Sequence, residues 1–135
     1  MLPAKRTVRL VAAAAGAAAL TLAFGIRAVA GGALEQHSGT ALYASLVYAL
    51  VVFVWPRINP VAAALAATGF CWAVEFAQLT PVPAALSERS IVARLVLGVA
   101  FDPVDLIWYP LGALVFMSLH LLALQAAGKR RPAGR

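Results

Sequence analysis

The residue in this sequence best placed to do chemistry is Glu75, a carboxylate inside the otherwise apolar stretch 71–79. Gln78 follows three positions later, so the two side chains would share one face of a helix. An ionisable group inside a membrane span costs about 2.5–3.5 kcal/mol on insertion scales and therefore usually has a partner or a function. Glu75 is the first candidate for a functional residue.

Two further carboxylates, Asp102 and Asp105, stand where the last apolar segment begins. Asp102 would cap a helix, Pro103 fits its first position, and an acid at position 105 suits the helix dipole. Capping therefore explains both aspartates without chemistry. If they converge with Glu75 instead, the three acids could bind a divalent cation or supply an acid–base pair. Spacing alone leaves both interpretations open.

Arg94 and Arg89 are the candidate counter-ions for Glu75, because both lie in the short segment 87–100 between the last two long apolar runs. Glu75 would then lock this segment in place, or it would lie protonated against a neighbouring helix, or it would serve a ligand. The candidate polar cluster comprises Glu75, Gln78, Arg94, Asp102, Asp105 and Tyr109. The histidines are single, and no cofactor motif or paired-cysteine site occurs, so we expect no metal and no cofactor.

The amino-acid composition indicates a membrane protein. Hydrophobic residues make up 63% of the 135 residues and charged residues 12%, against roughly 45–50% and 25% in soluble domains. A core of this size cannot hide so much apolar surface, which must face lipid. We expect one integral membrane domain over residues 1–135.

Four apolar segments indicate membrane helices, at about 10–26, 38–55, 61–79 and 106–127. The segment 87–100 is too short to span and carries Arg94, so we predict a short interfacial or re-entrant helix at the outer surface, with Ser87 as its N-cap. The predicted fold is an all-α membrane protein, a four-helix bundle with this outer helix between helices 3 and 4.

Basic residues set the predicted orientation. Both termini and the turn 56–60 would lie on one side, and that side carries Lys5, Arg6, Arg9, Arg57, Lys129, Arg130, Arg131 and Arg135. The positive-inside rule then places both termini, with the basic tail 128–135, in the cytoplasm. This distribution is typical of membrane flanks and predicts no nucleic-acid partner. A cleaved signal peptide ending near Ala30 is the alternative to a retained first helix.

Three segments resemble one family of small bacterial membrane proteins: 38–44, 75–79 and 97–112. The most specific parts are the Glu75-x-x-Gln78 pair and a string made of Phe101, Asp105, Leu106, Tyr109 and Gly112. This pattern, over roughly residues 10–125, is similar to the domain of unknown function (DUF) 2809 family. Many members carry Gly-Asp where this chain has Gly39-Thr40, which weakens a three-acid metal site. A looser likeness is to VanZ-like proteins, linked to glycopeptide tolerance.

The resemblance implies a multi-pass protein of the bacterial inner membrane and no established activity. We expect a non-enzymatic accessory or partner-binding protein in contact with the lipid bilayer, with a membrane-protein partner or a homo-oligomer left open. The alternative is a VanZ-like, envelope-facing enzyme or ligand-binding protein that acts on a lipid-linked or cell-wall molecule. A transporter is a third hypothesis, but four helices without a repeat offer little pathway.

Overall fold

The structure is a computed structural model that describes residues 3–130, and this part of the chain forms six α-helices. Their bounds are α1 Lys5–Val29, α2 Gly32–Val54, α3 Pro60–Ala77, α4 Val82–Arg89, α5 Ile91–Leu97 and α6 Asp105–Lys129. Residues 131–135 of the expected basic tail lie outside the described residues. Four of the helices, α1, α2, α3 and α6, are long and apolar enough to cross a membrane. The predicted all-α fold with four membrane helices is confirmed.

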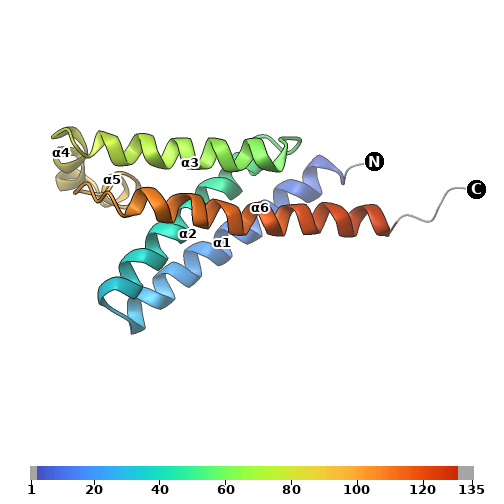
Figure 1. Cartoon of the computed structure of the whole chain (residues 1–135), viewed down its shortest axis with the longest axis horizontal. Helices are drawn as coiled ribbons and strands as arrows, with labels where there is room; N and C mark the ends of the chain where they lie inside the picture. The colour runs from blue at the N-terminus through green and yellow to red at the C-terminus, as the bar shows by residue number, and fades with distance from the viewer. Residues whose placement is uncertain (1–2, 131–135) are drawn as a thin grey trace, which may run out of the picture.

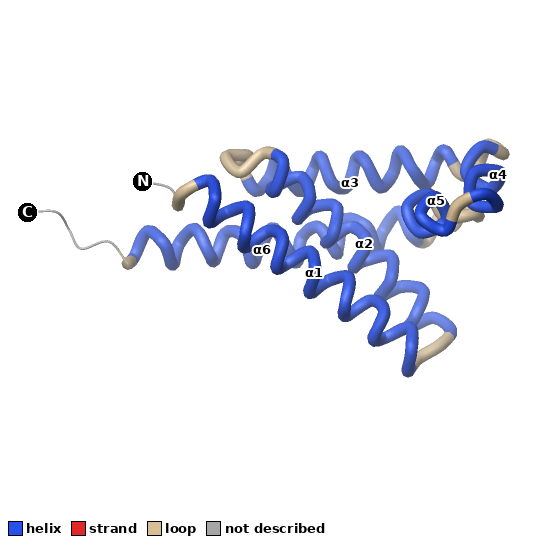
Figure 2. The backbone as a smooth tube through the Cα atoms, turned by 180° about the vertical axis from the view of Figure 1, so that it is seen from behind, coloured by secondary structure: helices blue, strands red, loops and turns tan. Residues whose placement is uncertain are grey.

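The long helices run back and forth between two ends of the molecule (Figure 1). At one end, which we call the terminal end, lie the N-terminal start of α1, the α2–α3 turn and the C-terminal end of α6. At the other, the cap end, lie α4, α5 and the α1–α2 turn. The hairpin of α1 and α2 is tilted against the α3–α6 pair, as Figure 2 shows from the opposite side.

Local capping chemistry accounts for the start of α3 but not for that of α6. Asn59 accepts a hydrogen bond from the Val61 N–H at 2.8 Å, and Pro60 takes the first position of α3. The predicted cap of α6 is wrong, because α6 begins at Asp105 with Val104 as its N-cap and no side-chain cap bond. Asp102 accepts a bond from the Val104 N–H at 3.0 Å, but in the turn before the helix. A tight turn of i→i+3 bonds lies between these residues.

Helix α2 begins at Gly32, six residues before the predicted start at 38. Its first turns are polar, so hydrophobicity gave no signal for them. They are helical because their side chains find partners elsewhere in the fold: Gln36 donates to Asp102, and Thr40 donates to Asp105.

The segment before α6 differs from the prediction. One short helix capped by Ser87 was expected, but α4 and α5 are two helices, and Ser87 lies within α4. Ser90 caps α5, because its hydroxyl accepts the Ala93 N–H at 3.2 Å. The Ser87 hydroxyl instead donates to the Gly98 carbonyl at 2.9 Å.

Helix α2 is the centre of the packing and contacts α1, α3 and α6. The interfaces use small residues, among them Ala44, Ala63 and Ala113, which are fully buried. The closest approach is at Gly112 of α6, where an added Cβ would lie 1.9 Å from the Ala41 carbonyl oxygen of α2. Ser45 fixes the same contact by donating to the Gly112 carbonyl at 2.9 Å.

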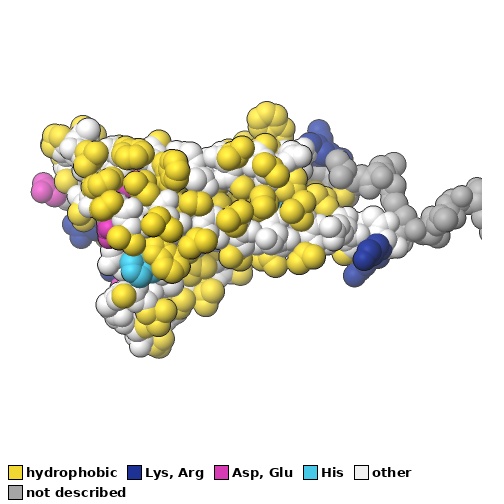
Figure 3. Space-filling model, viewed as in Figure 1, with side chains coloured by type: hydrophobic (Ala, Val, Ile, Leu, Met, Phe, Trp, Pro, Cys, Tyr) yellow, Lys and Arg dark blue, Asp and Glu magenta, His cyan; other side chains and the backbone are white. Residues whose placement is uncertain are grey.

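On the face shown in Figure 3, the surface is largely apolar along the helices and carries its charged side chains at the two ends. Large side chains such as Leu65 of α3 and Leu122 of α6 are exposed over more than half of their surface. In water this would be a large exposed apolar surface, whereas in a bilayer it is the lipid-facing side.

Candidate functional site

Glu75 lies at the cap end near the end of α3 and has no exposed surface. Its Oε1 accepts a hydrogen bond from the Asp102 backbone N–H at 2.7 Å. Its Oε2 accepts one from the Tyr109 hydroxyl, also at 2.7 Å. Both carboxyl oxygens therefore act as acceptors, and they join α3 to the loop before α6 and to the first turns of α6.

The expected ion pair between Glu75 and Arg94 or Arg89 is wrong. Both arginines are exposed, on α5 and at the end of α4. Within residues 3–130 the ion pair present is Arg27 with Glu35, at 3.5 Å across the α1–α2 turn. Backbone N–H and phenol O–H groups satisfy Glu75 in place of a cation, so no guanidinium needs to be desolvated.

Gln78 follows α3 and holds the end of α5. Its side-chain amide donates to the Leu97 carbonyl. The neighbouring carbonyls are also satisfied by side chains: Val96 accepts from the Tyr43 hydroxyl at 2.7 Å, and Gly98 accepts from Ser87. The last carbonyls of a helix have no partner within it. Side chains from α2, from α4 and from the residue that follows α3 supply those partners for the end of α5 and its C-cap.

Asp102 and Asp105 connect the start of α6 to α2. Gln36 donates to Asp102, and the Thr40 hydroxyl donates to Asp105 at 3.0 Å. Of the predicted cluster, Glu75, Asp102 and Tyr109 thus form one direct hydrogen-bonded group. Asp105 and Gln78 contribute parallel links at the same end of the molecule.

Three partners in α2 were not among the predicted site residues: Gln36, Thr40 and Tyr43. Their spacing of four and then three residues places them on one face of a helix, which is a signal that the sequence does contain. Because the predicted second helix began only at 38, this polar face was not recognised.

The side chains of the polar cluster mainly bond backbone groups and neighbouring side chains at the cap end, which leaves few of them free to bind a ligand or react with a substrate. No group of three His, Cys, Asp or Glu residues within 3–130 is placed to hold a metal ion. Two buried polar atoms in this part of the chain have no hydrogen-bond partner, His37 Nδ1 and Gln78 Oε1. The His37 ring stacks on Trp108, with the ring centroids 5.0 Å apart.

These features define a helical protein with four membrane-span-like helices and a buried polar cluster at one end. The family model described as "Protein of unknown function (DUF2809)" matches residues 29–113, which is more than half of the chain. The chain belongs to this family. The matched region begins at the end of α1 and extends into α6, so it contains the complete polar cluster. No curated protein and no solved structure matches the chain.

Proposed function

We propose that this chain is a non-enzymatic, multi-pass protein of the bacterial inner membrane that binds a membrane-protein partner through its cap end. In this proposal the polar cluster shapes and holds the α4–α5 cap, and the cap carries the binding surface. Both termini lie in the cytoplasm, and the cap end faces outward.

The observation that carries the proposal is that Glu75 is buried and that both of its carboxyl oxygens already accept hydrogen bonds. A general base or a ligand-binding carboxylate needs a free oxygen within hydrogen-bond reach of its target. Glu75 is fully buried, and each of its oxygens already accepts a hydrogen bond of 2.7 Å. A cavity of about 670 Å³ is present, but it lies at the terminal end and none of the six cluster residues lines it.

The binding surface is suggested by α5, a helix without a buried residue. Ile91 and Val92 are exposed over 78% and 69% of their surface, and Leu95 over half. Exposed Arg89 and Arg94 flank them. An exposed apolar strip with basic neighbours on a short, firmly anchored helix is typical of an interaction site, because apolar patches rimmed by polar residues mark such sites.

Photo-crosslinking in native membranes tests this proposal. A photoreactive residue is placed at Val92 in α5 and, as a matched lipid-facing control, at Leu65 in α3. We expect a discrete protein adduct from position 92, none from position 65, and strong loss of the adduct when Glu75→Gln is added. A heavier adduct of the chain with itself would identify the partner as a second copy. Lipid adducts alone at both positions would contradict partner binding.

Cysteine labelling tests the orientation separately. In a Cys71→Ala background, Ser90→Cys at the cap end should react with a membrane-impermeant maleimide in intact cells. Lys129→Cys at the terminal end should react only after the membrane is permeabilised. The reverse pattern would overturn the assignment of the termini to the cytoplasm.

A second candidate function is ligand binding at the cap end, as in the VanZ-like alternative, with a lipid-linked or cell-wall molecule as the ligand. It is favoured by the buried His37 Nδ1 and Gln78 Oε1, which have no partner within residues 3–130. Buried polar atoms nearly always have a hydrogen-bond partner, so these two unsatisfied atoms are compatible with a bound polar group. Binding of such a molecule that is lost in His37→Phe but retained in Glu75→Gln would favour this candidate.

A further inference from the structure

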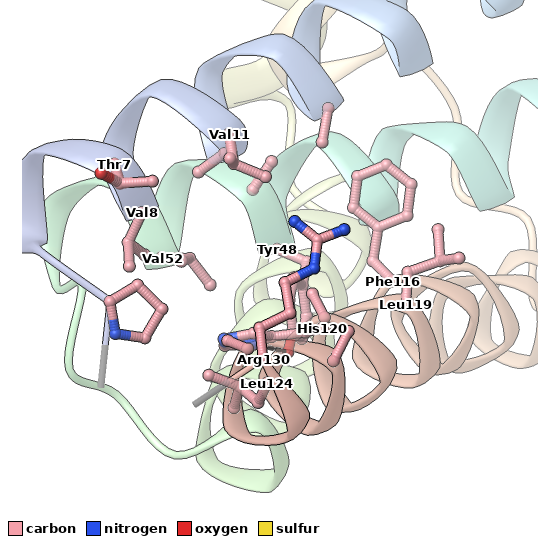
Figure 4. A pocket seen from close by; sticks show the side chains of 17 residues that line it. Thr7, Val8, Val11, Tyr48, Val52, Phe116, Leu119, His120, Leu124 and Arg130 are labelled. Atoms are coloured by element: carbon pink, nitrogen blue, oxygen red, sulfur yellow. Dashed lines mark hydrogen bonds between the residues drawn. The ribbon is translucent and has the colours of Figure 1, made fainter. Parts of the chain in front are cut away.

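The terminal end contains an open groove that the proposed function does not use. It has a volume of about 670 Å³, and its walls come from the first half of α1, the second half of α2 and the second half of α6. Pocket volumes of about 300–1,000 Å³ are typical of ligand sites. Figure 4 shows the groove with Val8 and Val11 on one side, and Phe116, Leu119 and Leu124 on the other.

The groove exists because α1 packs against α2 rather than against α6. Arg9 strengthens this attachment, since its Nε donates to the Phe53 carbonyl of α2 at 2.9 Å. The floor between α1 and α6 is closed by Tyr48, whose hydroxyl is 2.7 Å from His120 Nδ1. These two polar side chains satisfy each other, so the groove presents an almost wholly apolar lining.

The charge on the groove is all of one sign. Arg130 is the charged residue in its described lining, and it extends over the groove from the end of α6 (Figure 4). A small adjoining cavity shares Val8, His120 and Leu124 with the groove and adds Arg57 from the α2–α3 turn. Among residues 3–130, no acidic side chain lines either space. The basic end therefore complements an anion attached to an apolar chain.

The length of the groove matches one leaflet of a bilayer. From Phe116 to Arg130 the groove follows α6 for about 21 Å, at 1.5 Å per residue. A bilayer is about 40–45 Å thick with its head-group regions included, so one leaflet with its head groups occupies about 20–22 Å. A transmembrane helix of a partner would need a groove along the full thickness, and this groove is too short for it.

We propose that this groove binds an anionic phospholipid of the leaflet at the terminal end, with one acyl chain between α1 and α6 and the phosphate on Arg130. Basic pockets between membrane helices on the cytoplasmic side are known to take anionic head groups. The site lies at the opposite end from the polar cluster and does not depend on the proposed partner.

Native mass spectrometry of the full chain tests the proposal, with the protein released from nanodiscs of equal parts phosphatidylglycerol and phosphatidylethanolamine. We expect one phosphatidylglycerol retained in preference to phosphatidylethanolamine. Arg130→Gln should lower its retention about fivefold, in line with the attraction contributed by one basic residue near the membrane surface. Lys129→Gln removes the same charge from the neighbouring residue, which does not line the groove, and should have little effect.

A second pair of variants tests the apolar part of the site. Ala123 lines the groove from an exposed position on α6, whereas its exposed neighbour Leu122 does not line it. Ala123→Phe should displace the lipid, and Leu122→Phe should not. Equal retention of the two lipids, or equal loss in Arg130→Gln and Lys129→Gln, would overturn the proposal. A dimer that Ala123→Phe abolishes would also overturn it, because a second copy would then fill the groove.

Discussion

The two ends of this bundle are built from the same helices in opposite ways. At the cap end, Tyr43 of α2, Gln78 after α3 and Ser87 of α4 donate to backbone carbonyls at the end of α5. Glu75 accepts from the loop that leads into α6. At the terminal end, α1 and α6 stand apart over an apolar groove, and the polar contact on its floor is Tyr48 with His120.

The difference shows what closes a helical bundle in lipid. Apolar side chains do not draw helices together there, because lipid tails are as apolar as they are, and association depends on close packing and interhelical hydrogen bonds. The cap end has both. At the terminal end no hydrogen bond within the described part of the chain joins α1 to α6, and the groove between them stays open.

The largest effect that tests this comparison is expected in α6, which has Gly112 at its close contact with α2 and Gly128 near the terminal end. Gly112→Ala places a Cβ 1.9 Å from the Ala41 carbonyl oxygen, a clash with backbone that no side-chain rotation relieves. We expect it to lower the free energy of unfolding in detergent by about 3 kcal/mol or more. Gly128→Ala, with nothing within 4 Å, should be neutral or slightly stabilising. Similar thermal stability of both variants would contradict the close α2–α6 contact.

Removal of the Glu75 carboxylate should be the next largest effect. Glu75→Ala leaves the Asp102 N–H and the Tyr109 hydroxyl without their acceptor, and each unpaired buried group costs about 1–3 kcal/mol. We expect a loss of about 2–4 kcal/mol by chemical denaturation in detergent. Glu88→Ala on the exposed face of α4 should change stability by less than about 0.5 kcal/mol. Equal, small effects of both would show that Glu75 does not hold the cap.

The end of α5 gives a more local test. Gly98 has φ of 66°, and an added Cβ would lie 2.6 Å from the Gln78 amide nitrogen. Gly98→Ala should therefore cost about 2 kcal/mol and speed hydrogen exchange over residues 91–105. Gly32→Ala has the same φ of 66° but open space around it, so it isolates the backbone cost of about 1 kcal/mol. Equally fast hydrogen exchange over residues 91–105 in both variants would contradict a role of Gln78 in holding the end of α5.

The smallest effect is expected at the terminal end. His120→Phe removes the hydrogen bond to Tyr48, and such bonds between membrane helices average about 0.6 kcal/mol. Steric-trap unfolding measurements on this variant should show a loss well below that of Glu75→Ala. A loss as large as that of Glu75→Ala would remove the contrast between the two ends.

The sequence predicts the four long helices well because apolar length alone specifies a membrane span, and the family resemblance agrees with the match over residues 29–113. The polar start of α2 could not be found in this way, because Gln36 and Thr40 bond to partners 66 and 65 residues away. The ion pair with Arg94 failed for a related reason. Opposite charge suggested a partner nearby in the sequence, whereas the fold supplied the Asp102 backbone N–H and the Tyr109 hydroxyl, 27 and 34 residues away.

The central claim is that Glu75 is a structural acceptor that ties α3 to the start of α6. The most direct test is a double-mutant cycle of Glu75→Gln and Tyr109→Phe, measured as free energy of unfolding in one detergent. Because the two side chains share a hydrogen bond of 2.7 Å, we predict a coupling energy of about 1 kcal/mol, within the range found for contacting residues. Additive effects of the two substitutions, with no coupling between them, would contradict the account.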